Sequence, residues 1–307
     1  MKSNDIKNYD EEIDLKELII ALWNSKIFII ITSTFFILSS VIYSLSLPNI
    51  YKSNAILISA NQQDTVSSSL GSLSSLANIS GINLASSTSN DAQEAIARIK
   101  SYDFFSIYFI PNVSYQNIVA TKKWDSKSNI ITYDDNLFDT KTNKWIDSRK
   151  PSLQEAYEEY KNKVLISQDN LTQFITISVD HHSPTIAKKW LDIIILNINE
   201  SMRDRDKKEA QNAVTYLKNS YASTEIQSIR EVISKLLENQ IQVLMLAASK
   251  KAYVLEILES PIIPEKKSMP SRSLICIIGG ILGIFLSSSI VLVRHYLNKN
   301  NSLNVYD

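Results

Sequence analysis

The chain of 307 residues contains only 5 glycines and 1 cysteine. No glycine stands in a G-x-x-x-x-G-K-[ST] or G-x-G-x-x-G pattern, so neither kind of nucleotide phosphate loop is predicted. The sequence also lacks H-E-x-x-H, any cysteine cluster with metal-ligand spacing, and a G-x-S-x-G nucleophile elbow. We therefore expect no catalytic residue, no cofactor and no metal, and thus a protein that is not an enzyme.

The sequence also has no excess of charge of either sign, because its 32 Lys and Arg residues balance its 32 Asp and Glu residues. Such a chain has no strong field to attract a polyanion, and nucleic acid is excluded as a partner. The single cysteine, Cys276, rules out an intrachain disulfide. His181 and His182 are adjacent at a predicted strand-to-helix turn, where we favour hydrogen-bonded turn residues over a metal or acid–base role.

Long apolar runs are present at both ends of the sequence. Residues 27–47 and 274–293 carry no charge, and each run is long enough to cross a bilayer core of about 30 Å as a helix. The segment before the first run is acidic and no A-x-A follows it, which argues against a cleaved signal peptide. Pro48 directly follows the first run, and Pro270 stands just before the second. Two transmembrane helices are therefore predicted.

Two spans place both chain ends on one side of the membrane, and an uncleaved first span favours the cytoplasm for that side. The expected fold class is α+β, with an off-membrane domain that carries a long projecting helical hairpin and is anchored by two transmembrane helices. The expected segments are a cytoplasmic tail with an amphipathic helix (1–26), the first span (27–47), a periplasmic α/β base with helical arms at about 184–250 (48–273), the second span (274–293) and a cytoplasmic tail (294–307).

The first half of the middle domain mixes strand, polar and helical patterns. "IYKSNAILIS" after Pro48 has strand composition, and the Ser-rich residues 65–90 indicate a mobile or loosely helical excursion. "NDAQEAIARIKSYDFFSIYF" predicts one helix capped by Asn90 or Asp91. The polar stretch that follows, up to residue 150, predicts irregular structure in which Trp124 and Trp145 are packing residues.

The second half predicts regular elements. Ser152 caps a helix over "PSLQEAYEEYKNKV", and "FITISV" alternates as a half-buried strand. Ser183 then caps a helix that has Pro184 at its first position and runs to about residue 221, with a break near residue 223. "YVLEIL" returns as a strand that can pair with the first strand of the domain.

The second helical arm carries a wide apolar stripe. Thr224 and Gln227 suggest a capping box at its start. The stripe must be covered by the first arm or by a neighbouring chain, which makes it a candidate oligomer contact. Its residues are Ile226, Ile229, Ile233, Leu236, Leu237, Ile241 and Leu244.

Prolines and basic residues precede the second span. Proline-rich chain is extended and semi-rigid, so Pro261, Pro264 and Pro270 are expected to hold the last strand at a fixed offset from the span. The basic side chains in this region are expected at lipid headgroups: Lys266, Lys267 and Arg272.

Glycines are concentrated within the second span. Gly279 and Gly283 form a G-x-x-x-G, adjoined by Gly280, which lets two helices approach closely in lipid. Ordinary glycine enrichment in spans is the alternative explanation.

With these features in order, the chain resembles the Wzz-type polysaccharide co-polymerases, the O-antigen chain-length determinant family. The resemblance rests on "EIDLKELIIALWNSKIFIIITS" leading into the first span, "YKSNAILI" just after it, and the proline segment abutting a glycine-bearing second span. It covers nearly the whole chain. Departures from the family are a shorter chain than many members have and the Ser-rich stretch at 65–90.

The resemblance implies an inner-membrane protein of Gram-negative bacteria whose α/β base and long helices project into the periplasm. It also implies a homo-oligomeric ring without a catalytic site, which acts on the O-antigen polymerase, Wzy, and sets the length of the lipid-linked polysaccharide. A capsule or exopolysaccharide co-polymerase with a separate kinase or an outer-membrane exporter is the second hypothesis. A two-span sensor is the third, although "RHYLNKNNSLNVYD" is no signalling module.

Overall fold

The computed structural model describes residues 15–60, 87–146, 150–249 and 252–303. The chain divides into two compact units. One contains residues 1–48 and 269–307, and the other contains residues 49–268. The Ser-rich stretch, up to residue 86, lies outside the described residues.

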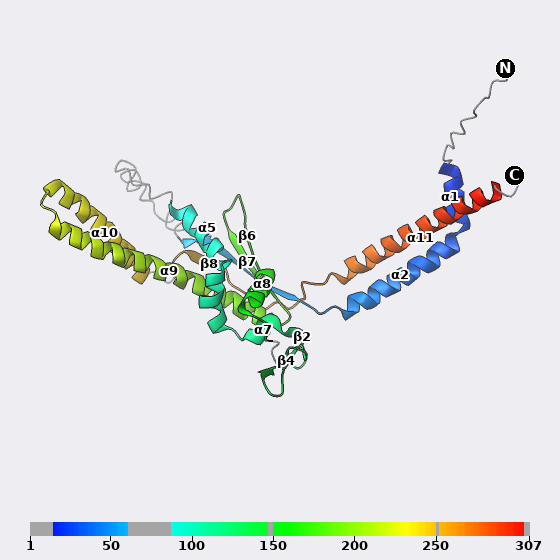
Figure 1. Ribbon diagram of the computed structural model, residues 1–307, viewed down its shortest axis with the longest axis horizontal. Coiled ribbons are helices and arrows are strands. Elements are labelled where there is room, and N and C mark those ends of the chain that lie inside the picture. The colour runs from blue at the N-terminus through cyan, green and yellow to red at the C-terminus, as the bar shows by residue number, and fades with distance from the viewer. Residues whose placement is uncertain (1–14, 61–86, 147–149, 250–251, 304–307) are drawn as a thin grey trace, which may run out of the picture. The chain divides into compact units, whose positions relative to one another are not determined.

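The first unit consists of three helices (Figure 1): α1 (Leu15–Asn24), α2 (Lys26–Ser46) and α11 (Arg272–Leu303). α2 and residues 272–297 of α11 are long and apolar enough to cross a membrane. Only 11% and 17% of their most apolar windows are buried, unlike core helices of a soluble protein. Both are candidate membrane spans.

The second unit is built on a four-stranded antiparallel sheet with the order β6-β7-β1-β8. The strands are β1 (Tyr51–Ser59), β6 (Val164–Gln168), β7 (Ile175–His181) and β8 (Leu255–Glu259). The expected pairing of the first and last strands is confirmed, with Leu57 opposite Ile257 and Ser59 opposite Leu255. β6 and β8 are the two edges of this sheet.

One face of the sheet carries the hydrophobic core. Alternate residues of β1 and β7 are buried there, as period-2 side-chain alternation requires. They pack against α5 (Ser87–Ile99), α8 (Leu153–Lys163) and the first half of α9 (Pro184–Ser223). Trp190, Tyr160 and Phe109 are fully buried at the centre, and the ring of Phe109 contacts the rings of the other two.

The expected single helix after residue 90 is wrong in two respects. α5 begins at Ser87, so Asn90 and Asp91 lie within the helix and do not cap it. The helix ends at Ile99, because Ser101 caps a new one: its Oγ accepts the N–H of Phe104. The chain continues as α6 (Tyr102–Phe104), the π-helix η2 (Phe105–Phe109) and the 3₁₀ turn η3 (Ile110–Asn112).

The polar stretch before residue 150 is also more regular than expected. After α7 (Tyr115–Val119) it forms two small hairpins. Their strands are β2 (Thr121–Asp125), β3 (Ile130–Tyr133), β4 (Phe138–Asp139) and β5 (Lys144–Trp145). Trp124 lies in β2 and packs edge-on against Tyr51, and Trp145 lies in β5 and packs against Tyr115 and Phe138.

Several local predictions are confirmed. Ser152 and Glu155 form a reciprocal capping box at α8, and α9 begins at Pro184 and ends at Ser223. Two proposed caps are wrong. The Ser183 hydroxyl bonds to the Thr185 hydroxyl instead of a backbone N–H, and the Thr224 hydroxyl donates back to Ser220 O.

The second half of α9 forms an antiparallel hairpin with α10 (Gln227–Ser249). At 1.5 Å per residue, the 40 residues of α9 reach about 60 Å. Figure 1 shows the hairpin extending away from the sheet, with only the first half of α9 on the core. The expected fold class, a mixed α/β domain with a long helical hairpin and two candidate membrane helices, is confirmed.

Candidate functional site

The glycines of the second span lie against the first span. A Cβ on Gly279 would stand 2.6 Å from Cβ of Ser40, and one on Gly283 would stand 2.9 Å from Cβ of Phe36. At Gly280 the nearest atom, on Ile37, is 3.4 Å away, which is ordinary contact. Gly279 and Gly283 therefore permit a close approach of α11 to α2, a contact within one chain. We call this contact the glycine seam.

The proline segment lies along β1. Ser53 Oγ donates to the carbonyl of Ile262 at 2.8 Å, and the N–H of Ser268 donates to the carbonyl of Ile50 at 2.8 Å. Pro261 is buried, Pro264 is half-buried, and Lys266 and Lys267 are exposed. Pro270 and Arg272 belong to the first unit, whereas Lys266 and Lys267 belong to the second.

The apolar stripe of α10 is only partly covered by α9. Ile233 is buried, and Leu237 and Leu244 are half-buried. Ile226, Ile229, Leu236 and Ile241 keep 44% or more of their surface exposed. They are joined by three exposed residues that the sequence analysis did not include: Val232, Met245 and Leu246. A substantial apolar surface thus remains open on the hairpin.

A groove lies at the root of the hairpin, between α9, the end of α10 and β8. Its volume is about 920 Å³. The walls combine apolar residues, of which Leu196 and Ile257 are prominently exposed, with the charged residues Asp192, Glu200, Arg203 and Glu256. Ala247 and Ala248 leave room at the end of α10. Sequence reasoning missed this groove, because its residues come from three separate segments.

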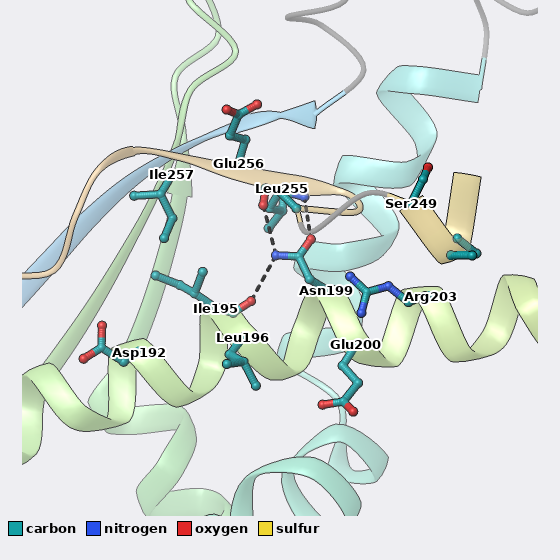
Figure 2. A pocket seen from close by; sticks show the side chains of 13 residues that line it. Asp192, Ile195, Leu196, Asn199, Glu200, Arg203, Ser249, Leu255, Glu256 and Ile257 are labelled. Atoms are coloured by element: carbon teal, nitrogen blue, oxygen red, sulfur yellow. Dashed lines mark hydrogen bonds between the residues drawn. The ribbon is translucent and has the colours of Figure 1, made fainter. Parts of the chain in front are cut away.

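Asn199 ties the returning chain to α9 beside this groove (Figure 2). Its side-chain oxygen accepts the backbone N–H groups of Tyr253, Val254 and Leu255 at 2.8 to 3.0 Å. Its amide nitrogen donates to the carbonyls of Ile195 and Leu255. Because both the oxygen and the nitrogen of this buried amide have hydrogen-bond partners, Asn199 fixes where β8 begins relative to α9.

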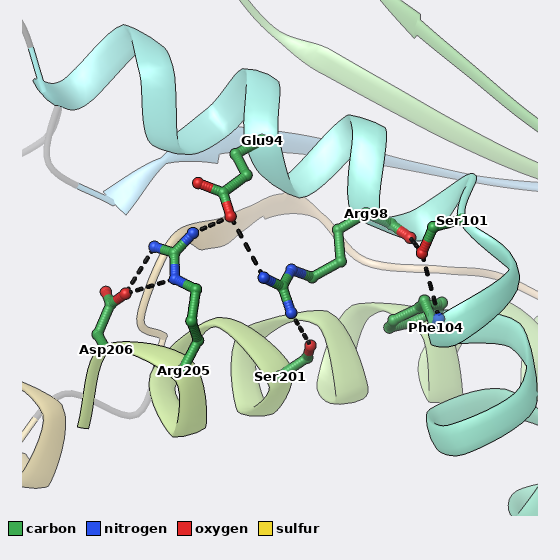
Figure 3. Close-up of polar contacts among 7 residues, drawn as sticks. All are labelled: Glu94, Arg98, Ser101, Phe104, Ser201, Arg205 and Asp206. Carbon is green, nitrogen blue, oxygen red and sulfur yellow. Dashed lines mark hydrogen bonds and ion pairs between the residues drawn. The ribbon is translucent and has the colours of Figure 1, made fainter. Parts of the chain in front are cut away.

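A network of charges connects α5 to α9 on the other side of the hairpin root (Figure 3). The Glu94 carboxylate contacts the guanidinium groups of both Arg98 and Arg205. Arg205 also holds Asp206, which accepts the Tyr253 hydroxyl at 2.7 Å. Burial, and then the Asp206 charge, raises the pKa of nearby Asp91. The network fixes the middle of α9 against α5.

The two histidines hydrogen-bond to the backbone. The ring of His181 is buried, its Nδ1 accepts the Ser183 N–H, and its Nε2 donates to Asn117 O at 3.0 Å. Burial lowers the pKa of His181 to about 3, so the ring is neutral at physiological pH. His182 Nδ1 lies 3.0 Å from Asn49 O. Within the described ranges, no group of three or more His, Cys, Asp or Glu residues could hold a metal ion.

Two family models match the sequence. Residues 11–111 match Wzz, the chain length determinant protein, and residues 222–296 match GNVR, a G-rich domain on putative tyrosine kinase. The comparison with curated proteins gave no significant match.

Among solved structures, a full-length bacterial polysaccharide co-polymerase is 14% identical, with 94% of this chain and 99% of that chain covered and a TM-score of 0.44. A fragment of WzzB, the polysaccharide co-polymerase from Salmonella Typhimurium, is also 14% identical, with 72% and 100% covered and a TM-score of 0.36. Over residues 11–111, the chain is thus similar to the chain length determinant family.

Proposed function

We propose that this protein sets the length of lipopolysaccharide O-antigen by acting on the Wzy polymerase as a non-catalytic oligomeric scaffold. The observation that carries the proposal is the match of residues 11–111 to the chain length determinant family. The described parts of the chain support it, because they supply two candidate spans, a long helical hairpin and an exposed apolar stripe that could serve self-association. No cofactor is required for such a role.

The proposal places the two spans in the inner membrane, residues 48–273 in the periplasm, and both tails in the cytoplasm. Lys266, Lys267 and Arg272 would then contact lipid headgroups. Labelling with a membrane-impermeant maleimide tests this topology in the Cys276→Ser background. Lys100→Cys should react in intact spheroplasts and Asn300→Cys only after lysis. Reaction of both positions in intact spheroplasts would refute it.

The proposal also places copies of the chain in a ring, with the α10 stripe as one contact. Full-length protein in mild detergent should behave as a large homo-oligomer by light scattering. Ile229→Lys and Ile241→Lys should shift the mass downward, since each would place a charge on an apolar contact. Glu231→Lys, also exposed on α10, is the matched control that should leave the mass unchanged. A monomeric wild type in several detergents would refute the ring.

Deletion of the gene tests the function itself. The lipopolysaccharide of the host should lose its modal ladder and show a random distribution of lengths, and a plasmid copy should restore the mode. An unchanged ladder would refute the O-antigen role.

The second candidate is a co-polymerase for capsule or exopolysaccharide. The match of residues 222–296 to a domain found on putative tyrosine kinases favours it specifically. In that case a separate kinase or an outer-membrane exporter would be the partner. The same deletion strain separates the two candidates, because loss or shortening of the capsular polymer with an intact O-antigen ladder would identify the second.

A further inference from the structure

An exposed leucine stands at the tip of the β6–β7 hairpin. Leu171 is 94% exposed, more than any other large apolar side chain in the described part of the chain. The loop that carries it is tightly held, because the Asp169 carboxylate accepts the backbone N–H groups of Leu171 and Thr172, both at 2.8 Å. The loop is also closed by Asp169 N–H to Phe174 O at 2.9 Å. A preordered loop that displays one apolar side chain has the features of a docking element, since little entropy is lost when it binds.

The groove at the root of the α9–α10 hairpin has complementary features. It is open and about 920 Å³ in volume, and its apolar residues are accompanied at the wall by Asp192, Glu200, Arg203 and Glu256. Leu196 and Ile257 there are 65% and 45% exposed. Ala247 and Ala248 keep the α10 side shallow. A leucine on a narrow loop can enter such a space, and it would cover two side chains that water now contacts.

The sheet places the loop and the groove at the same end but on opposite edges. Leu57 of β1 pairs with Ile175, the first residue after the loop, and two residues later Ser59 pairs with Leu255 at the groove. β6, which leads into the loop, is one edge of the sheet, and β8 is the other. Three strand spacings separate these edges, roughly 14 Å. The hairpin tip of one chain therefore lies beside the groove of a second chain placed next to it along the sheet.

We propose that Leu171 of one copy docks into the groove lined by Leu196, Ala248 and Ile257 of the next copy. The contact is head-to-tail, because the two surfaces differ, and repetition of such a contact generates a ring when the rotation closes. This inference rests on the proposed homo-oligomer and names a surface for it. It is distinct from the α10 stripe.

Cysteine pairs test the contact in the full-length chain with Cys276→Ser. Leu171→Cys together with Ala248→Cys should give, on oxidation in membranes, a ladder of dimers and higher species on a non-reducing gel. A disulfide needs Cα atoms within about 7 Å, so the two sites cannot join within one chain across the sheet. Two co-expressed single-cysteine proteins should give dimers only, and each single variant alone should give none. The control pair, Lys141→Cys with Ala248→Cys, should give no ladder.

Leu171→Asp provides a second measurement that does not depend on crosslinking. Because the side chain is almost fully exposed, the variant should keep the thermal midpoint of the wild type while losing the large species in light scattering. Leu171→Met should keep that species. A large oligomer that gives no ladder, or that survives Leu171→Asp unchanged, would overturn this contact while leaving the oligomer proposal intact. A monomeric wild type would instead overturn both.

Discussion

The glycine seam allows a prediction with an internal control. Gly279→Ala would place a Cβ 2.6 Å from Cβ of Ser40, whereas carbon atoms pack at about 3.5 to 4.0 Å, so α2 and α11 must separate by about 1 Å. Gly283→Ala meets both a side chain and, at 3.1 Å, the backbone of Ser33. Overpacking of this kind costs about 1–3 kcal/mol. Gly280→Ala meets only Ile37 at 3.4 Å and should be tolerated.

Comparing the three Gly→Ala variants separates the effect of the close contact between α2 and α11 from the effect of intrinsic helix preference. All three substitutions gain the intrinsic helix preference of alanine over glycine, about 1 kcal/mol, so differences among them reflect the seam alone. Energy transfer between dyes on Ser46→Cys and Ser271→Cys, in the Cys276→Ser background, would follow the separation of α2 and α11 as SDS is added to mild detergent. The midpoint should fall for the first two variants and not for Gly280→Ala. Equal midpoints for all three variants would refute close packing of the seam.

Three further predictions concern the second unit. Asn199→Ala leaves buried N–H groups of the chain before β8 without an acceptor, and should lower the free energy of unfolding by about 2 kcal/mol or more, measured by thermal or urea unfolding. Arg205→Met removes the link from Glu94 to Asp206 and should cost about 1 kcal/mol, less at high salt, since these side chains are partly exposed. His181, whose burial lowers its pKa to about 3, should make stability fall as pH drops below about 6.5, and His181→Gln should flatten that fall.

Each of these has its own control and contrary result. Asn199→Asp keeps the acceptor and should lose less than Asn199→Ala, and equal losses would contradict the role of the carboxamide oxygen. Arg205→Lys should lose part of the effect of Arg205→Met, and a salt-independent loss would argue for packing instead of charge. For His181, the ring binds a proton near pH 6.5 in the unfolded chain but not in the folded one. The free energy of unfolding therefore keeps its full contribution from His181 above that pH and loses it below. Steeper acid sensitivity in His181→Gln would show that another group titrates.

The sequence predicts elements whose signals are local. The alternation of "FITISV" gave β7, and Ser152 followed by Glu155 gave the start of α8, because side-chain period and capping depend on neighbours in the chain. Thr224 shows the limit of such signals. Its hydroxyl could accept an N–H of the following helix or donate to a carbonyl of the preceding one, and it donates to the carbonyl of Ser220.

Residues that act across long separations gave no such signal. Asn199 is one polar residue within a long helix, and only the fold brings the N–H groups of residues 253–255 to its carboxamide. Glu94 meets Arg205 in the same way, after more than a hundred intervening residues. The seam glycines were visible as a spacing, but the sequence could not say which helix they meet.

Helix α9 joins the two regions on which the proposed function depends. Its first half supplies Trp190, Leu191 and Ile194 to the core, and Asn199 and Arg205 fix its middle to β8 and α5. Its second half leaves the core as a continuous helix and carries α10 with the open stripe. The open stripe and the groove proposed to receive a second copy are therefore both attached to the same helix.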